Sequence, residues 1–220
     1  MKLTEEGTFD ASALSLGAIP EGTSILLTGD DTDAIETVFY HLVAAGENER
    51  SLILATETNG RTVNRELDRI EYGVSNRSTI LACRGAATDS DITTVDDITD
   101  LTGVGMQFSA LVAESGTMAA SQRAGILLCS NICQEVDDIQ SVFQFLNANF
   151  LSHLRRDGIM GVCAVDTSAD VGGEIDGLVE TMAGAFSAHI SVESTDSEEL
   201  LLHLDGEEVE SKSVTLTLSE

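Results

Sequence analysis

Short, strongly apolar segments alternate with helix-length amphipathic segments along most of the chain. The apolar segments are rich in Leu, Ile, Val and Ala, and their length is typical of buried strands. The segments between them repeat apolar residues at helical spacing, as in 34–45, where Ile35, Val38 and Leu42 share one face. Strands that alternate with helices build a mostly parallel sheet with helices on its faces. The sequence therefore predicts an α/β fold.

The order of elements follows from this alternation and from the turn residues between segments. The pattern predicts strands over 24–28, 51–56, 79–83, 125–129 and 159–165, and helices over 34–45, 61–70, 106–122, 139–155 and 175–186. Three closing β-like runs, AHISVE, ELLLHL and SVTLTL, predict an antiparallel meander, while the acidic run TDSDITTVDDITD predicts an exposed loop. We expect one domain over 1–220, a three-layer sandwich whose mostly parallel central sheet is extended by the C-terminal meander.

Acidic residues dominate the charge of the chain, because 38 Asp and Glu stand against 11 Lys and Arg and give a formal net charge of −27. They are spread through a chain that keeps regular apolar segments, which indicates an acidic folded surface and not a disordered tail. Repulsion at this charge opposes compaction unless salt screens it, and the screening length falls from about 30 Å at 0.01 M to about 3 Å at 1 M. We expect the cytoplasm of a halophilic organism, with an ordinary very acidic protein as the alternative.

Composition also disfavours several kinds of partner. Nucleic-acid phosphates attract clusters of Lys and Arg, but only Arg155 and Arg156 are adjacent, so we do not expect direct nucleic-acid binding. No segment approaches the roughly 20 apolar residues that cross a bilayer, and the N-terminal MKLTEEGTFD does not resemble a signal peptide. We therefore expect a cytoplasmic protein without a membrane partner.

The residue types that hold metals or act as nucleophiles are scattered. The four histidines have no ligand spacing, and no serine stands in a GxSxG motif, so neither a zinc hydrolase nor a serine hydrolase is supported. Cysteines 83, 129, 133 and 163 lie in or beside apolar runs, which is typical of buried, reduced thiols. We predict no metal site and no catalytic residue.

The first strand-to-helix turn is the place where folds of this kind bind phosphate groups. A working phosphate loop reads GxxxxGK followed by Ser or Thr, because its glycines let N–H groups surround the phosphates and its Lys and hydroxyl reach the outer phosphates and magnesium. Gly29 begins such a turn, but Ala34, Ile35 and Glu36 replace the second glycine, the lysine and the hydroxyl residue. A shift by one residue restores Thr37 but supplies no lysine.

Carboxylates also stand where a triphosphate would arrive. Asp30, Asp31 and Asp33, with Thr32 among them, follow Gly29 directly, and like charges at close range oppose binding. We expect ATP to bind weakly if at all, and we assign no cofactor. The simplest interpretation is that Asp30 or Asp31 caps the helix that follows.

The segment LSLGAIPEGTSILLTGDDTDAIETVFYHL resembles the opening of KaiC-like members of the RecA superfamily, where glycines and a proline precede the strand, the phosphate loop and the helix. Gly17, Pro20, Gly22 and Gly29 match that opening. The blocks DLTGVGMQFS, SVFQFLNANFLSHLRRDGIMGVCAVD and ELLLHL extend the likeness along most of the chain, which is similar to KaiC/GvpD-like proteins of salt-loving archaea. This resemblance implies a RecA-like fold in which nucleotide use is optional.

The resemblance further implies an Asp that ends an apolar strand and helps to hold magnesium, and an acid after the second strand that can polarise water. The run GILLCSN offers Cys129, Ser130 and Asn131 in place of the Asp, whereas Glu57 matches the acid. An acid without a lysine or a magnesium ligand is not an active site. Glu57 is therefore only a candidate for lining the crevice, and an ordinary loop residue is the alternative.

We interpret the chain as a non-catalytic RecA/KaiC-like domain, a pseudo-ATPase, that acts in regulation or assembly through a protein partner or further copies of itself. One alternative is a small-ligand sensor that uses the former nucleotide crevice near Gly29, Glu57 and Gly103. Another is an atypical ATPase to which a partner supplies a lysine or an arginine.

Overall fold

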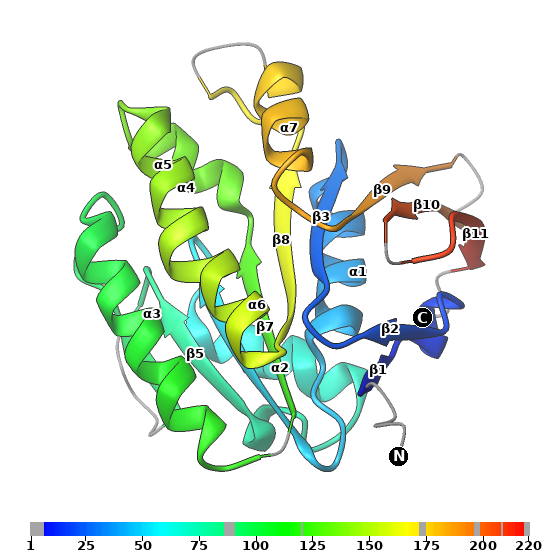
Figure 1. Cartoon of the computed structure of the whole chain (residues 1–220), viewed down its shortest axis with the longest axis horizontal. Helices are drawn as coiled ribbons and strands as arrows, with labels where there is room; N and C mark the ends of the chain where they lie inside the picture. Colours follow the sequence, from blue (N-terminus) through cyan, green and yellow to red (C-terminus); the bar gives the residue numbers. More distant parts are fainter. Residues whose placement is uncertain are drawn as a thin grey trace, which may run out of the picture.

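A nine-stranded sheet runs through the molecule, with helices on both of its faces (Figure 1). The computed structural model describes residues 7–85, 91–119, 121–171, 175–195, 199–207 and 209–217. The strands of the sheet are β3 (Ser24–Gly29), β4 (Glu49–Ala55), β5 (Ser78–Ala82), β6 (Ile92–Thr94), β7 (Ser121–Leu127), β8 (Met160–Asp166), β9 (Ala188–Ser194), β10 (Glu199–Gly206) and β11 (Lys212–Thr217). Their order is β11-β10-β9-β3-β8-β7-β4-β5-β6.

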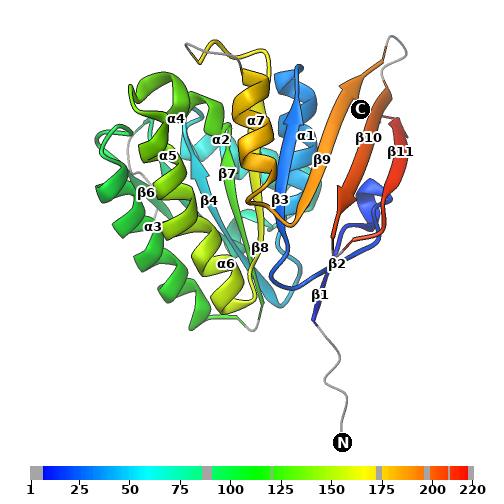
Figure 2. The same ribbon diagram turned by 45° about the horizontal axis from the view of Figure 1, so that its top comes forward.

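All neighbours from β9 across to β6 pair in parallel, whereas β10 pairs antiparallel with β9 on one side and with β11 on the other. Figure 2 shows the antiparallel strands as an extension of the parallel sheet on the side of β3. The expected central sheet and C-terminal meander are therefore confirmed.

Helices cover both faces of the parallel strands. They are α1 (Thr32–Val43), α2 (Gly60–Ile70), α3 (Leu101–Gly116), α4 (Cys129–Glu135), α5 (Ile139–Phe145), α6 (Ser152–Asp157) and α7 (Ile175–Ala183), with short 3-10 turns η1 (Ser12–Leu14) and η2 (Ser75–Arg77). A π-helical stretch, η3 (Leu146–Leu151), joins α5 to α6. No helix in the described part of the chain has both the length and the apolar composition that spanning a bilayer requires.

Two apolar clusters fill the spaces between the sheet and its helices. Successive strand residues point to opposite faces, so Ile25 and Leu27 of β3 join one cluster while Leu26 joins the other. The first cluster includes Ile35 and other residues of α1 and α2, and the second includes Phe108 of α3. The expected three-layer arrangement is confirmed.

The N-terminal region contains structure that the sequence pattern did not predict. Strands β1 (Thr8–Asp10) and β2 (Ala18–Pro20) form a two-stranded sheet of their own, joined by η1. Pro20, which we expected only to precede the first strand, ends β2. The hairpin packs apolar residues such as Phe9 and Ile19 against the cluster on the α1 face.

Three expectations for the middle of the chain were wrong in detail. The acidic run expected as a loop contributes β6 at the edge of the sheet; its residues 88–90 lie outside the described part of the chain. Helix α3 begins at Leu101, ahead of the expected 106, because Asp100 caps it, and it therefore includes Gly103 and Gly105. Strand β7 likewise begins early, at Ser121, and the residues after Leu128 form α4 in place of a strand end.

Candidate functional site

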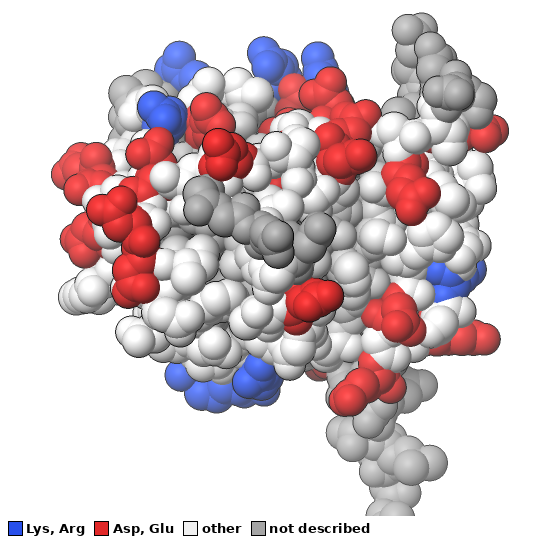
Figure 3. All heavy atoms as spheres, turned by 90° about the horizontal axis from the view of Figure 1, so that it is seen from above, with Lys and Arg blue, Asp and Glu red and all other residues white. Residues whose placement is uncertain are grey.

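The carboxyl ends of the parallel strands meet at one edge of the sheet, where ligands bind in open α/β folds. Gly29 at the end of β3 pairs with Asp166 of β8 and with Val192 of β9. Figure 3 views this end of the molecule, and acidic side chains are spread across it while Lys and Arg lie toward its periphery. The residues that the sequence nominated, 29–33 and Glu57, all follow strands that end here.

The first turn is short and is closed by its own carboxylate. Helix α1 begins at Thr32, and Asp31 is its N-cap, whose Oδ1 accepts from the N–H of Asp33 at 3.0 Å and from the N–H of Ala34 at 3.2 Å. Its Oδ2 accepts from the Ser194 hydroxyl at 2.6 Å. These hydrogen bonds, the one from Ser194 foremost, lower the pKa of Asp31. The N–H groups that would surround a phosphate are therefore already bound to a negative charge.

The residues that replace the second glycine and the lysine face the core. Ala34 is 3% exposed and Ile35 is fully buried, so neither side chain points to the open edge of the sheet. A Cβ on Gly29 would lie 2.9 Å from the carbonyl oxygen of Val192 and 3.0 Å from Cγ1 of Ile35. The turn is therefore packed closely against β9 and α1 at Gly29.

Asp166, which the sequence analysis did not nominate, joins the end of β8 to this turn. Its Oδ2 accepts from the Thr32 hydroxyl at 2.5 Å, and its Oδ1 accepts from the N–H and the hydroxyl of Ser168 at 2.8 and 2.6 Å. The next residue, Thr167, donates from its N–H and from its hydroxyl to the Gly29 carbonyl, both at 2.7 Å. The sequence does carry a sign of this residue, because Asp166 ends an apolar run. An Asp at the end of an apolar strand is the feature that we sought in GILLCSN, at the end of β7.

Glu57 lies a few strands away in a polar pocket of about 340 Å³. Its Oε2 accepts from the Asn131 amide at 3.2 Å, and that amide also donates to the Thr56 hydroxyl at 3.2 Å. The Thr56 hydroxyl in turn donates to the carbonyls of Leu127 and Leu128. The charged side chains in the lining are Glu57, Arg84, Asp96, Asp97 and Glu135.

Glu36 of α1 is influenced by the negative charges of several neighbouring acidic side chains. Its pKa is raised, first by burial and then by the negative charges of Asp33, Glu66 and Glu57. Acidic residues thus face one another across α1, α2 and the turn after β4. This concentration of negative charge disfavours anions at this part of the edge.

Gly103 is not brought to this pocket. It lies in the first turn of α3, where its N–H donates to Asp100 Oδ1 at 3.0 Å. Among the described residues no group of three or more His, Cys, Asp or Glu side chains is placed to hold a metal ion. Cysteines 129, 133 and 163 are buried free thiols, as expected, whereas Cys83 is partly exposed.

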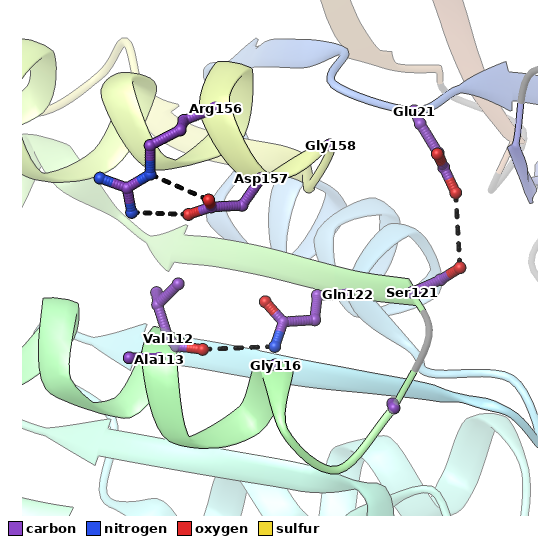
Figure 4. Close-up of a pocket in the computed structure, with 10 residues that line it drawn as sticks. Glu21, Val112, Ala113, Gly116, Ser121, Gln122, Arg156, Asp157 and Gly158 are labelled. Carbon is purple, nitrogen blue, oxygen red and sulfur yellow. Dashed lines mark hydrogen bonds and ion pairs between the residues drawn. The ribbon is translucent and has the colours of Figure 1, made fainter.

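A second pocket, of about 400 Å³, opens at the opposite edge of the sheet, near the ends of α3 and α6 (Figure 4). Its polar side chains bind one another: Arg156 pairs with Asp157 at 2.7 Å, and the Ser121 hydroxyl donates to Glu21 at 3.4 Å. The Gln122 amide donates to the Val112 carbonyl at 3.3 Å. These contacts leave few free polar groups to fix a ligand.

Ser109, His153 and Asp157 contact one another in that order, and Asp157 also lines this second pocket. His153 Nε2 lies 3.0 Å from the Ser109 hydroxyl, and His153 Nδ1 lies 3.3 Å from Asp157. However, Nδ1 also lies 2.6 Å from Nη2 of Arg156, and guanidinium groups only donate. Nδ1 therefore accepts and the Nε2 proton is donated to Ser109, which is the reverse of what a nucleophilic serine needs. We interpret these contacts as a link between α3 and α6.

Comparison with solved structures shows a RecA-type, KaiC-like fold. A KaiC-like protein of the hyperthermophilic archaeon Pyrococcus horikoshii matches with a TM-score of 0.64 and 14% identity, over 96% of this chain and 94% of that chain. An uncharacterized protein of the same organism, solved in complex with an unknown peptide, matches with a TM-score of 0.65 and 9% identity, over 90% and 89% of the two chains. Curated proteins give no match. Residues 22–192 match DUF7504, a family of unknown function, and the chain belongs to that family.

Proposed function

We propose that this chain is a non-catalytic RecA/KaiC-like domain that acts in regulation or assembly through contacts with other protein chains. The observation that carries the proposal is the closed first turn. The Asp31 carboxylate takes the N–H groups of Asp33 and Ala34, and the side chain at position 35 is an isoleucine in the core. A triphosphate would have to displace a bound carboxylate and approach a surface of like charge.

The end of β7 gives the proposal further support. Cys129 and Ser130 are fully buried there, and the Ser130 hydroxyl accepts from the N–H of Asp166 at 3.2 Å. No carboxylate follows this strand directly, since the next residues are Asn131 and Ile132. The end of β7 therefore supplies no carboxylate for a magnesium ion, and the nearby Asp166 carboxylate already accepts from Thr32 and Ser168.

Protein contacts are supported by the acidic surface of the chain and by one protein of similar fold. The strongly acidic surface suits a salt-rich cytoplasm and attracts basic partners. The similar structure that was solved with an unknown peptide is a fold relative with a bound chain segment. We include a halophilic cytoplasm in the proposal, because the net charge of −27 requires screening.

The test is ATP turnover by the purified chain in molar KCl, with and without magnesium, beside a Glu57→Gln variant. The proposal predicts that phosphate release stays at the background level and is the same for both proteins. Turnover that Glu57→Gln abolishes would contradict it and would favour an ATPase with an atypical loop. The same assay with a cell extract fraction added tests whether a partner completes such a site.

A second candidate is a small-ligand sensor, and the pocket around Glu57 is the specific observation that favours it. Its carboxylates outnumber its single described Arg, so it would take a neutral or cationic metabolite. A thermal-shift screen in high salt would detect such a ligand, because binding at 100 times Kd stabilises a protein by about 2.7 kcal/mol. The candidate requires a shift that Glu57→Gln and Asn131→Leu both reduce. Shifts that neither variant alters would contradict it.

A further inference from the structure

Strand β11 lies at the end of the nine-stranded sheet, and one of its two edges has no partner strand in the described part of the chain (Figure 2). Its other edge pairs with β10 without interruption, from Lys212 opposite Leu204 to Thr217 opposite Glu199. The strand is exposed at Lys212, Ser213, Thr215 and Thr217 and half-buried at Val214 and Leu216. On that second edge, no described strand pairs with the row of backbone N–H and C=O groups that an edge strand presents.

The devices that usually block such an edge are almost absent. Proteins protect edge strands with charges, prolines, bulges or a covering segment. The stretch from Ser213 to Thr217 carries no charge and no proline, and its register with β10 has no bulge. Lys212 is the one charged residue of the strand, and its ammonium group donates to the Ser15 carbonyl in the N-terminal region.

The acidic side chains around this edge lie near its two ends. Glu207 and Glu210 are exposed in the turn that leads into β11, and Glu199 of β10 stands opposite Thr217 at the far end. The stretch from Ser213 to Thr217 is therefore an uncharged ladder with carboxylates near both ends, and Lys212 at one end is held by the Ser15 carbonyl, on a chain of net charge −27. A segment that is uncharged in its middle and basic at its ends complements this arrangement.

We propose that the β11 edge binds an extended segment of a partner protein, with a β-branched, uncharged middle and Lys or Arg at its ends. This inference rests on the proposed function in protein contacts. Backbone hydrogen bonds would supply the affinity of strand addition, and side chains on alternate positions would supply the specificity. Val214 and Leu216, half-buried beside the core, would be covered by an apolar residue of the added strand. A second copy of this chain would bring its own charge of −27 and is disfavoured.

The test uses three fluorescent peptides at the lowest KCl concentration at which circular dichroism shows the full chain to be folded. The peptide KKVTVTVKK has basic ends, EEVTVTVEE has acidic ends, and KKVTPTVKK has the same charge but a proline that removes one N–H and resists strand pairing. We expect saturable anisotropy with the first peptide and about tenfold weaker binding of each of the others.

Two variants separate the edge from the general charge of the molecule. Thr215→Lys places a positive charge on the exposed face of β11, and Gln140→Lys makes the same change at an exposed position of α5. We expect Thr215→Lys to weaken the basic peptide about tenfold more than Gln140→Lys does. Equal effects of the two variants, or equal binding of the proline peptide, would overturn the inference and leave only general charge attraction.

Sedimentation velocity on the same samples tests whether a second copy of this chain binds the β11 edge instead. A dimer that Thr215→Lys dissociates and Gln140→Lys preserves would assign the edge to a second copy and would also overturn the inference. Failure of every peptide to bind would remove strand addition at β11 but would not touch the proposed function, which fails only if the chain turns over ATP.

Discussion

At the scale of residues, Arg123 shows how a buried charge holds separate segments together. Its side chain is 3% exposed, and its Nε donates to Glu49 at 2.6 Å. Further hydrogen bonds reach the carbonyls of Leu42 at 2.8 Å and Asp10 at 3.2 Å, and the guanidinium lies 5.2 Å from the centre of the Phe9 ring. One side chain of β7 therefore joins β4, α1 and the N-terminal hairpin.

We predict that Arg123→Met lowers the free energy of unfolding by about 3 to 5 kcal/mol, because it leaves Glu49 half-buried without its partner. Arg65→Met is the control, since the Arg65 side chain is 63% exposed and an exposed ion pair contributes only about 0 to 1 kcal/mol. Urea denaturation of the two variants measures both values. Equal losses of unfolding free energy in the two variants would contradict the stabilising role of Arg123.

His189 gives a prediction about pH. Its Nε2 lies 2.8 Å from the Thr28 hydroxyl, and burial lowers its pKa below the ordinary 6.5, although the charge of Asp205 acts in the opposite direction. Because the folded chain binds this proton less tightly than the unfolded chain, the stability from neutral His189 is complete above pH 6.5 and is lost as the pH falls through the lowered value.

We therefore expect the Tm of His189→Gln to change less than the Tm of the parent chain between about pH 7.5 and about pH 5.5. The general effect of net charge is present in both proteins, so the difference between them reports on His189. Asp205→Asn should increase that dependence, because it removes the charge that favours the protonated ring. The same pH dependence in all three proteins would contradict this account of His189.

Part of the candidate site could be predicted from the sequence, and the rest depends on contacts between residues that are distant in the chain. Gly29, Asp31 and Glu57 were identified because they follow apolar runs or lie in a known motif. Asp166 also ends an apolar run, but its place beside the first turn was missed because its partner, Thr32, is far away in the chain. The contacts of Arg123, outside this site, were missed for the same reason, since its partner Glu49 lies on another strand. Only the strand order brings such pairs together, and composition and periodicity do not determine it.

At the scale of elements, the close approach of α3 to the π-helical stretch η3 explains why residue 105 is a glycine. A Cβ on Gly105 would lie 2.6 Å from the side-chain amide carbon of Asn149. Helices can approach this closely only where one of them lacks a side chain. Gly105 of α3 is therefore a helix-packing position.

We predict that Gly105→Ala destabilises the chain in spite of the higher helix propensity of alanine, because Asn149 must shift. The matched control is Gly177→Ala in α7, where the added Cβ has no described atom within 4 Å apart from its chain neighbours and the backbone of its own helix. That change should stabilise the chain by up to about 1 kcal/mol. Thermal unfolding of both variants decides the point, and a stabilising Gly105→Ala would contradict the packing argument.

The elements that the sequence predicted are those with long, regular patterns. Strand β3 is buried at every residue and is visible as a continuous apolar run, whereas helix α1 buries seven residues at helical spacing. Helix α4 was missed because it follows β7 directly through Leu128, which has a φ of 57° that a sequence pattern does not reveal. Strand β6 has only three residues and takes its conformation from pairing with β5.

At the scale of the whole molecule, the net charge of −27 dominates behaviour in solution. Acidic side chains are spread across the carboxyl edge of the sheet, and the few cations lie toward the periphery (Figure 3). We predict that Tm rises steeply as KCl increases from about 0.05 M to about 2 M, because screening removes repulsion that the unfolded chain relieves by expanding. Scanning calorimetry across this range measures the effect, and a Tm independent of salt would contradict a halophilic origin.

The central claim is that the first turn of this RecA-like chain does not bind a triphosphate. Isothermal titration calorimetry of the parent chain with ATP and magnesium in molar KCl tests it most directly. The account predicts no saturable heat at millimolar ATP, because Asp31 holds the N–H groups and Ile35 lies in the core. Saturable, magnesium-dependent binding that Thr32→Val weakens would contradict it, since Thr32 donates to Asp166 beside this turn.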